Sequence, residues 1–359
     1  MEGKLRIALA GVGFGEKYLV GLLPNPDVEV VGVYSRRQER AAEIADRYRL
    51  PFHTRHYPEL LQHPRLDAVA VVTPNSTHAE FVLAALRARK HVICDKPLAL
   101  NAAEGVELRQ FADAVGVRHV TFVPYRFSPA ALAMKQAMAE GRVGRVIRVR
   151  GGWGVDLRNE PLRWRFQSRL SGPGVVADLG AHLLDLLVWW VGPIRRVLGR
   201  CRTHVPERPA EVGGLMKAVD VPDEASALLE FAGSGVGSVN LSWNAKRDQK
   251  VEIEGDVGTL TYESPSLLQW LDGKGPFTPS VTFLPRGGAK PEQLPLPQMP
   301  YFDTQPRALA WMFMHVVSYL RGEPKPDPVA TFTDGAAVLQ VMDGMVESGE
   351  TGKWLEVNV

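Results

Sequence analysis

The sequence predicts an α/β protein whose first third forms a doubly wound parallel sheet. Two observations predict this fold: strand-like and helix-like segments alternate through residue 123, and the first strand runs into a glycine-rich turn that leads into a helix. The chain has 359 residues, of which 45% are hydrophobic, and this length favours two domains. Because the alternation ends at residue 123, we expect one domain over 1–123 and a second over 124–359.

The first strand is expected at Leu5–Ala10 and the first helix at Tyr18–Leu23, with the glycine turn between them. Gly11 suits the tight turn, and Gly13 lets the backbone approach a pyrophosphate at the amino terminus of the helix. The predicted phosphate loop consists of Gly11, Gly13, Phe14 and Gly15. Glu16 stands where the usual third glycine would be, so its carboxylate must point away from the phosphates. An ordinary turn between a strand and a helix is the alternative interpretation.

The second strand, Val28–Tyr34, ends in Ser35, Arg36 and Arg37. NAD enzymes tend to carry an acid at this point for the ribose hydroxyls, and a carboxylate there would repel a 2′-phosphate. A hydroxyl and a guanidinium would bind that phosphate. We therefore expect NADP(H) as the favoured cofactor, with NAD(H) possible. In the alternative interpretation, these arginines only solvate the start of the next helix.

Another predicted strand, Asp67–Val72, also ends in polar residues at the presumed cofactor cleft. The residues that follow it are Thr73, Pro74 and Asn75. Ser76 or Thr77 is expected to cap a helix that runs to about residue 88. His78 falls in the first turn of that helix, where a lone histidine is more often a capping or packing residue than a catalyst.

The strand Val92–Cys94 is apolar throughout, as strands buried on both faces are. Asp95 and Lys96 follow just past its carboxyl end, where open α/β sheets bind their ligands. Pro97 restricts the backbone of the lysine, so the side chain is held in place. A partly desolvated lysine at such a position can transfer protons. A surface lysine in a turn is the alternative.

Past the predicted boundary, the most informative stretch is Ser171–Asp185. Asp178, His182 and Asp185 are spaced four and three residues apart, so a helix would place all three on one face. Gly180 would leave room beside that face for a flat ring or a sugar. We favour a proton-transfer face, because polar groups on an apolar helix are costly unless satisfied or used. Satisfied helix-end residues and a zinc or manganese site are the alternatives, although no third or fourth metal ligand is visible nearby.

The remainder of the chain predicts a second sheet. Strand patterns lie at Arg195–Val205, Ala225–Phe231, Gly235–Trp243 and Lys250–Glu254, and Ser128 is expected to cap a helix before them. Residues 273–300 hold seven prolines and are expected to form a long irregular excursion. Helices are expected at Gln305–Leu320 and Thr333–Ser348, and an added strand near Trp354–Val357.

Three polar segments stand out when the whole chain is considered. They are Thr73-Pro74-Asn75-Ser76-Thr77-His78, Asp95-Lys96-Pro97 and Asp178-Leu179-Gly180-Ala181-His182-Leu183-Leu184-Asp185. Together with the glycine turn, their order and spacing resemble those of the Gfo/Idh/MocA family of oxidoreductases over nearly the whole length. The family carries glutamate where this chain has Asp95, so any bridge from that side chain to the cofactor would have to be rebuilt.

The resemblance implies a Rossmann domain followed by an α+β domain with a large open, mostly antiparallel sheet. It also implies hydride transfer between a nicotinamide and a sugar, cyclitol or related carbinol. Lys96 would be the general acid/base, with His182 as its partner or alternative, and Asp178 would orient the substrate or tune His182. The cofactor residues implied are Thr73, Pro74, Asn75, His78, Asp95, Lys96, Trp164 and Arg165, and the further substrate residues are Tyr125 and Arg126.

Two other functions on the same fold remain open. Some relatives use a retained nicotinamide to hydrolyse glycosidic bonds, and others only sense NAD(P) and bind protein partners. A sensor could lose Lys96 and His182, and this chain has both, so we rank the sensor last.

The overall composition limits the partners. The chain has 42 Lys and Arg against 40 Asp and Glu, which gives no reason to expect nucleic acid. We expect no signal peptide and no membrane span, because no uninterrupted apolar run approaches ~18 residues. With only Cys94 and Cys201, a reducing cytoplasm is the expected location. The expected partners are a small-molecule substrate and further copies of the chain, in a homo-dimer or homo-tetramer formed through the second sheet.

Overall fold

In the computed structural model, the chain divides into two compact units. The structure describes residues 3–245, 248–265, 267, 271, 278–288, 290–298 and 305–357. Unit 1 comprises Met1–Val123 and Pro300–Ala336, and unit 2 comprises Pro124–Met299 and Ala337–Val359. The first boundary falls where the strand–helix alternation ends. Residues 300–336 belong to unit 1, although the sequence predicted them to lie in the second domain, 124–359.

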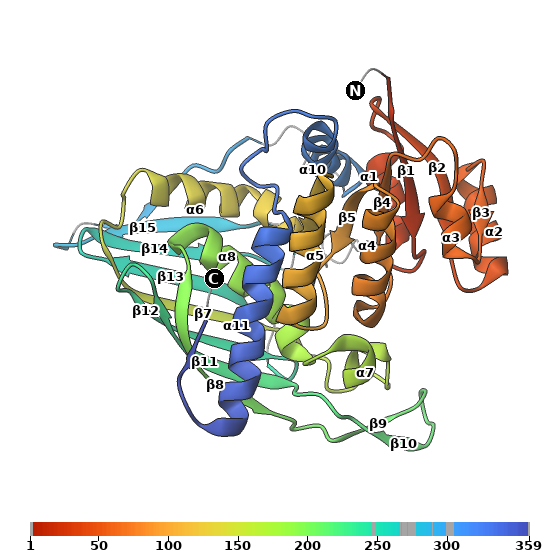
Figure 1. The fold of residues 1–359 in the computed structure, drawn as a ribbon. Helices are drawn as coiled ribbons and strands as arrows, with labels where there is room; N and C mark the ends of the chain where they lie inside the picture. The colour runs from red at the N-terminus through yellow and green to blue at the C-terminus, as the bar shows by residue number, and fades with distance from the viewer. Residues whose placement is uncertain are drawn as a thin grey trace. The chain divides into compact units, whose positions relative to one another are not determined.

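Unit 1 is built on a six-stranded parallel sheet in the described residues, with strand order β3-β2-β1-β4-β5-β6 (Figure 1). Its strands are β1 (Leu5–Ala10), β2 (Val28–Tyr34), β3 (His53–Thr54), β4 (Ala68–Val71), β5 (His91–Asp95) and β6 (His119–Phe122). The strand order reverses between β1 and β4, which is the point where such sheets bind dinucleotides at the carboxyl ends of their strands. The predicted doubly wound parallel sheet is confirmed.

Helices connect successive strands of this sheet. They are α1 (Gly15–Leu22), α2 (Gln38–Tyr48), α3 (Tyr57–Leu61), the 3-10 turn η1 (Asn75–Thr77), α4 (His78–Arg87) and α5 (Ala102–Val115). The predicted cap of α4 is wrong: Thr77 makes no side-chain cap bond, because its hydroxyl lies 2.8 Å from Thr73 Oγ1 and 2.9 Å from the Pro74 carbonyl. The turn η1 thus uses the residues that were expected to cap the helix.

Helix α10 (Gln305–Leu320) comes from far along the sequence but packs against α1 in unit 1. A Cβ at Gly21 would lie 2.5 Å from Phe313 Cδ2, so the two helices approach closely only because residue 21 is glycine. The Phe313 ring stacks on Phe122 with centroids 4.8 Å apart and lies 5.0 Å from the ring of Tyr18. This packing explains why the segment belongs to unit 1.

Unit 2 is built on a nine-stranded sheet among the described residues, in the order β16-β15-β14-β13-β7-β12-β11-β8-β17. Its strands are β7 (Val146–Gly154), β8 (Ile194–Arg202), β11 (Glu224–Phe231), β12 (Val236–Ser242), β13 (Gln249–Gly255), β14 (Gly258–Glu263), β15 (Ser280–Pro285), β16 (Glu292–Gln293) and β17 (Leu355–Glu356). All neighbours are antiparallel except β7 and β12. The expected large, mostly antiparallel sheet is therefore confirmed. A separate hairpin joins β9 (Glu207–Pro209) and β10 (Met216–Ala218).

The proline-rich stretch 273–300 is less irregular than expected, because β15 and β16 extend the sheet edge within it. The rest of its described residues are turns or irregular chain, and 273–277, 289 and 299–300 lie outside the described residues.

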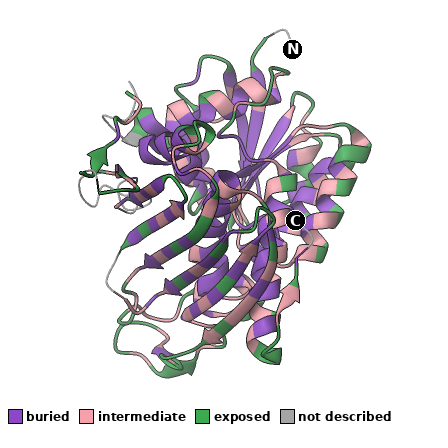
Figure 2. Ribbon diagram, turned by 90° about the vertical axis from the view of Figure 1, so that its left-hand side faces the viewer, coloured by how far each residue is buried: buried purple, intermediate pink, exposed green. Residues whose placement is uncertain are grey.

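One face of the larger sheet is packed against helices and the other is open. Figure 2 shows buried and exposed residues alternating along its strands. The covering helices are α6 (Pro129–Ala139), α8 (Ala181–Val191) and the later part of α11 (Phe332–Thr351), as seen in Figure 1. On the open face, Arg148 pairs with Glu254 at 2.5 Å and Arg150 pairs with Glu252 at 3.2 Å. The side-chain period of two along each strand explains this division.

The stretch Ser168–Val191 is long and apolar enough to cross a membrane by length and composition, which the sequence-based prediction did not anticipate. However, 78% of its apolar window is buried inside the structure, and bends at residues 172–174 interrupt it. It consists of α7 (Ser168–Ser171), a π-helical turn η4 (Val176–Gly180) and α8. Buried core helices reach the same length and apolar composition, so these two properties are weak evidence for a membrane span.

Candidate functional site

The glycine loop between β1 and α1 has the shape that a dinucleotide requires. Gly11 has a φ of +102°, and a Cβ there would lie 2.5 Å from the Val72 carbonyl oxygen. At Gly13 no atom lies within 4 Å of the position a Cβ would take, so the backbone is open to a close ligand. A Cβ at Gly15 would lie 3.3 Å from Leu9 Cδ2, so Gly15 itself provides the close helix–strand contact. These residues fit a pyrophosphate at the start of α1.

Glu16 directs its carboxylate to α2, as the displaced glycine requires. Its Oε1 lies 2.5 Å from Arg47 and accepts a hydrogen bond from the Tyr48 hydroxyl at 3.0 Å, and its Oε2 lies 3.1 Å from Arg40. Two guanidinium groups near the loop are thereby neutralised within the protein. Phe14, which precedes α1, is 41% exposed, with the Lys17 ammonium 5.9 Å from its ring.

The carboxyl end of β2 presents two cations to solvent. Arg36 and Arg37 are both exposed, and in the part of the chain that the structure describes neither guanidinium forms a salt bridge. The Arg37 amide donates to Ser35 Oγ at 3.3 Å, which fixes the turn. Arg40 and Arg47, by contrast, are engaged with carboxylates. Two positive charges therefore remain for an anionic ligand at this edge.

His78 joins two loops of unit 1 rather than offering a ring nitrogen to a cofactor. It is buried, its Nδ1 lies 2.7 Å from the Pro97 carbonyl oxygen, and its Nε2 lies 2.9 Å from the Thr73 carbonyl oxygen. Burial lowers the pKa of His78, while nearby Asp95 and the two carbonyls oppose that shift. The ring thus links the turn after β4 to the turn after β5, where the Lys96–Pro97 peptide bond is cis. The resemblance implied cofactor contact for His78; the structure shows both of its nitrogens used by the backbone.

Lys96 lies at the carboxyl end of β5, where the sequence predicted it. Its amide donates to Asp95 Oδ1 at 2.9 Å, so the neighbouring carboxylate fixes the backbone that carries the lysine. Burial raises the pKa of Asp95, and the charges of Lys96 and His78 act against that rise. Burial also raises the pKa of the Tyr18 phenol, and the charge of Asp95 raises it further.

Asp178 lies in the π-helical turn η4 rather than in a regular α-helix. Its Oδ2 accepts a hydrogen bond from Trp243 Nε1 at 3.1 Å and lies 3.9 Å from Arg165 NH1. Arg165 in turn lies 5.8 Å from the ring of Trp164, which is 40% exposed. π-turns within helices occur often at functional sites, and this one directs Asp178 toward an indole N–H that holds the carboxylate.

His182 lies one turn later, at the start of α8, and is buried among aromatic rings. Its ring centroid is 4.8 Å from that of Tyr125, edge-on, and 5.8 Å from that of Trp153. The Tyr125 hydroxyl accepts a hydrogen bond from Gln249 Nε2 at 2.9 Å. Tyr125 belongs to the 3-10 turn η2 (Pro124–Phe127).

Asp185 and Arg126 form a buried ion pair, which corrects two expectations. The guanidinium donates to both carboxylate oxygens, at 2.7 and 2.8 Å, and both side chains are about 1% exposed. Asp185 is therefore not part of a shared titratable face, and Arg126, predicted at the substrate, has a structural partner instead. Because Arg126 follows Tyr125 directly, the pair fixes η2 against α8 and so positions Tyr125 beside His182.

Gly180 also differs from the expectation. A Cβ at this position would lie 3.0 Å from Leu241 Cδ1, so the glycine allows η4 to approach β12 and does not leave room for a ligand. The prediction failed because the spacing of polar residues identifies a helix face but not what covers it.

The predicted site residues fall into two groups, one in each unit. Those gathered at the strand ends of unit 1 are Gly11, Gly13, Thr73, Asn75, His78, Asp95 and Lys96, and those gathered in unit 2 are Tyr125, Arg165, Asp178 and His182. That Lys96 meets His182 in one pocket stays a prediction. Among the described residues, no group of three His, Cys, Asp or Glu side chains could hold a metal ion.

Three residues of this region were missed by sequence reasoning: Trp153, Trp243 and Gln249. Gln249 had a signal, since it occupies the inward register of β13 with Val251 and Ile253. A polar side chain at a core-facing strand position calls for a partner.

Two family models match the chain, one for each part. Residues 5–122 match an oxidoreductase family with an NAD-binding Rossmann fold, and residues 131–261 match the GFO/IDH/MocA C-terminal domain. The two models together span most of the chain.

Characterised proteins resemble the chain over nearly its full length. Levoglucosan dehydrogenase of Pseudarthrobacter phenanthrenivorans is 31% identical, with 93% of this chain and 91% of that protein aligned. The 1,5-anhydro-D-fructose reductase of Ensifer adhaerens is 29% identical, with 95% of each aligned. A solved structure of levoglucosan dehydrogenase with NADH and L-sorbose superposes with a TM-score of 0.85 at 26% identity, covering 99% of both chains.

Proposed function

Because the chain belongs to the Gfo/Idh/MocA family of NAD-binding oxidoreductases, we propose that it transfers hydride between a nicotinamide and a carbinol or carbonyl carbon of a sugar, cyclitol or related polyol. The relatives named for levoglucosan and 1,5-anhydro-D-fructose support this substrate class. One observation carries the proposal: the chain combines an open dinucleotide loop and Lys96 in unit 1 with Asp178 and His182 in unit 2. A protein that only sensed the dinucleotide would need the loop alone.

The protein residues have to manage a proton while the bound nicotinamide supplies or accepts the hydride. Removing hydride from a carbinol leaves a carbonyl only if the hydroxyl proton also departs, so a base must lie within hydrogen-bond reach. We assign this role to Lys96, with His182 as its partner or alternative. Asp178, held by Trp243, orients the substrate or His182. In the reduction direction, Lys96 or His182 donates the proton to the developing alkoxide.

The test is a screen of sugars and polyols with oxidised and reduced nicotinamide cofactors, followed at the absorbance of the reduced nicotinamide. A net absorbance change with a polyol is the expected result. Release of sugar from a glycoside without net change would instead indicate a hydrolase that oxidises its substrate transiently. If neither activity is found across the panel, the proposed enzymatic function is wrong.

We further propose that NADP(H) is preferred over NAD(H). Arg36 and Arg37 support this preference, because both are exposed at the end of β2 and unpaired with carboxylates in the described part of the chain, and Ser35 adds a hydroxyl. A 2′-phosphate would gain charge-assisted hydrogen bonds there. Titration should give a lower Kd for NADPH than for NADH, and Arg36→Ala should weaken NADPH binding while leaving NADH binding unchanged. Tighter binding of NADH by the wild-type protein would contradict the preference.

A homo-oligomer formed through the open face of the larger sheet, in the cytoplasm, completes the proposal. Leu198 and Leu228 lie opposite each other on that face, and Leu228 is 49% exposed. Cys94 and Cys201 are both free thiols, as a reducing compartment allows. Light scattering should give a dimer or tetramer, and Leu228→Glu should shift it toward smaller species; a monomeric wild-type protein would contradict this part.

A further inference from the structure

Two residues paired across neighbouring strands of unit 2 each have a buried polar atom without a hydrogen-bond partner among the described residues. The atoms are Nε1 of Trp153 and Oε1 of Gln249. Trp153 is 2% exposed and Gln249 is 7% exposed. The two residues are directly opposite each other in the antiparallel register of β7 and β13, on the packed side of the sheet. Directly opposed residues have Cβ atoms ~5 Å apart, so one small group can reach both side chains.

The surroundings fix the orientation of both groups. Gln249 donates through Nε2 to the Tyr125 hydroxyl at 2.9 Å, which leaves Oε1 as an acceptor. The Trp153 ring lies 4.6 Å from the Tyr125 ring and 5.8 Å from the His182 ring. The Trp153 ring thus lies near the imidazole to which we assign a role in proton transfer, and Gln249 bonds the tyrosine that packs on that imidazole.

Leaving such atoms unpaired is costly, because each has lost its hydrogen bonds to water on burial and gained none in return. Native structures rarely keep such groups without a water, an ion or a ligand that completes them. A hydroxyl group can complete both, as a water molecule can, because its oxygen accepts from the indole N–H while its proton is donated to the amide oxygen. A carbonyl group could accept from Trp153 but could give nothing to Gln249.

We propose that Trp153 and Gln249 bind one non-reacting hydroxyl group of the substrate, next to the carbon that exchanges hydride. This inference rests on the proposed function and narrows its substrate class to polyols that carry a hydroxyl beside the reacting carbinol or carbonyl. The hydroxyl cannot be the reacting one, because neither an indole N–H nor an amide oxygen can take up or release the proton that oxidation moves. The pair therefore determines specificity, while Lys96 and His182 serve the reacting oxygen.

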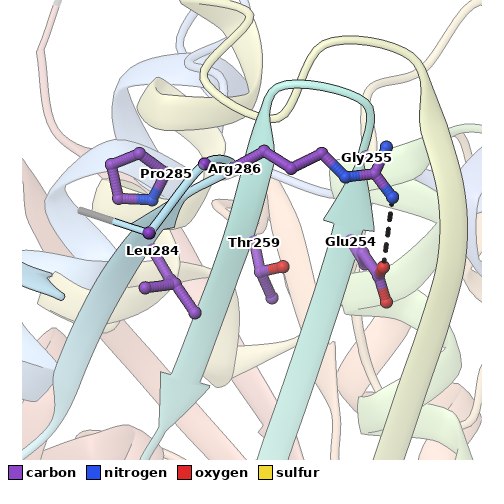
Figure 3. A pocket seen from close by; sticks show the side chains of 9 residues that line it. Glu254, Gly255, Thr259, Leu284, Pro285 and Arg286 are labelled. Atoms are coloured by element: carbon purple, nitrogen blue, oxygen red, sulfur yellow. Dashed lines mark ion pairs between the residues drawn. The ribbon is translucent and has the colours of Figure 1, made fainter. Parts of the chain in front are cut away.

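A pocket elsewhere in unit 2 does not compete for this role. It lies at the far end of β13 and is lined by Glu254, Thr259, Leu284 and Arg286 (Figure 3). Glu254 is five residues from Gln249, or about 16 Å along a strand. Its carboxylate already pairs with Arg148, at 2.5 Å, and lies 3.8 Å from Arg286.

The experiment compares each polyol with analogues that lack one hydroxyl. The probes are D-glucose, levoglucosan and myo-inositol with their mono-deoxy counterparts, and the variants are Trp153→Phe and Gln249→Met. Trp153→Phe keeps an aromatic ring against Tyr125 and removes only the N–H donor. The matched control is Trp190→Phe in the same unit, because Trp190 Nε1 already donates to the Ala131 carbonyl at 3.1 Å.

We expect Trp153→Phe to lower kcat/KM for the complete polyol by roughly 5- to 150-fold, which corresponds to one lost hydrogen bond in a buried site. For one particular deoxy analogue the variant and the wild type should be equal, because the hydroxyl that Trp153 would bind is absent. Gln249→Met should lower kcat/KM for the complete polyol too, and should equal the wild type for the same deoxy analogue. Trp190→Phe should change kcat/KM by the same factor for every substrate, or leave it unchanged.

Two results would overturn the inference. The first is an equal loss, or no loss, for Trp153→Phe across every polyol and every deoxy analogue, as expected if only an ordered water completes the two atoms. The second arises if the wild-type protein turns over no polyol. The proposed function then fails, and calorimetric binding of the same probes tests the subsite by itself. Equal affinity of the wild type and Trp153→Phe, or no binding by either, would then end the case for the subsite.

Discussion

Two buried polar clusters, one in each unit, differ in how far the protein itself satisfies them. In unit 1, His78 uses both ring nitrogens on backbone carbonyls, and the Asp95 carboxylate holds the amide of Lys96. In unit 2, Trp153 and Gln249 keep a donor and an acceptor that no described residue completes. The protein alone thus holds the cluster around His78. The pair in unit 2 instead leaves a donor and an acceptor for the hydroxyl that we propose it binds.

The largest expected effect tests whether the two units act in one reaction. Lys96→Met in unit 1 and His182→Asn in unit 2 should each lower kcat by about 10²- to 10⁴-fold, the usual contribution of a general acid or base. The Kd of the cofactor should change little, since neither side chain forms the glycine loop. Steady-state kinetics and cofactor titration measure the two quantities. Full turnover by both variants would refute the role assignment, whereas loss in only one would identify the proton donor.

The next effect concerns the buried ion pair of unit 2. Arg126→Met leaves the Asp185 carboxylate buried without its partner, so the free energy of unfolding should fall by about 3–5 kcal/mol. The double variant Arg126→Met/Asp185→Leu should recover much of that loss, because no isolated charge remains. Urea denaturation provides the measurement. A fall below about 1 kcal/mol in the single variant would show that the pair does not hold η2 against α8 as inferred.

The folding stability should depend on pH through His119, a buried residue of unit 1. His119 is buried, and its Nδ1 accepts a hydrogen bond from the Phe332 amide at 3.0 Å, so the ring is held neutral. Burial lowers the pKa of His119 below the ordinary 6.5, although Asp113 and Asp334 act against the shift. At pH values well above 6.5 the imidazole is neutral in both the folded and the unfolded chain, so it does not make stability depend on pH. As the pH falls through 6.5, the unfolded chain takes up a proton that the folded ring does not, and the free energy of unfolding falls by up to ~1.4 kcal/mol per pH unit.

Thermal unfolding measured between pH 7.5 and 5.5 should show this loss for the wild type. His119→Asn keeps an acceptor for the Phe332 amide but does not titrate, so its curve should be flatter. His56→Asn, which replaces an exposed histidine, is the matched control and should follow the wild type. An identical pH dependence for all three proteins would contradict the assignment.

The smallest effect compares one helix cap from each unit. Asn101 accepts from the Glu104 amide at 2.9 Å at the start of α5, and Ser128 accepts from the Ala131 amide at 3.1 Å at the start of α6. Substitution of either by alanine should cost about 0.5–2 kcal/mol of stability. Activity should stay near that of the wild type for Asn101→Ala. Denaturant midpoints test the prediction, and an unchanged midpoint in either variant would show that its cap bond is replaced by solvent.

Much of unit 1 could be predicted from the sequence because its signals are local. The predicted bounds of β1 and β2 match the structure residue for residue, since strands buried on both faces are apolar runs bounded by polar turns. Helix α10 was predicted with its bounds as observed, yet its unit was not, because a helical period does not name the surface that the helix covers. That assignment depended on Gly21 and Phe313, which are about 290 residues apart in the chain.

Less of unit 2 could be predicted, since its site depends on pairings between distant residues. The spacing of Asp178, His182 and Asp185 did identify a polar helix, but the π-turn and the separate partners of the three side chains follow from tertiary contacts. No local pattern announces that Arg126 will meet Asp185 or that Trp243 will hold Asp178. The inward register of Gln249 was the one local clue to the unmade bonds of this unit.

The early glycine of the nucleotide loop has a consequence for how cofactor choice can change. Gly15 fills the steric role one position ahead of the usual residue, which frees position 16 for a charged side chain. Glu16 then restrains Arg40 and Arg47, two cations that would otherwise strengthen the positive potential near Arg36 and Arg37. The shape of the turn and the charge beside it are therefore set by different residues. Cofactor preference can drift through substitutions at position 16 while the turn itself stays intact.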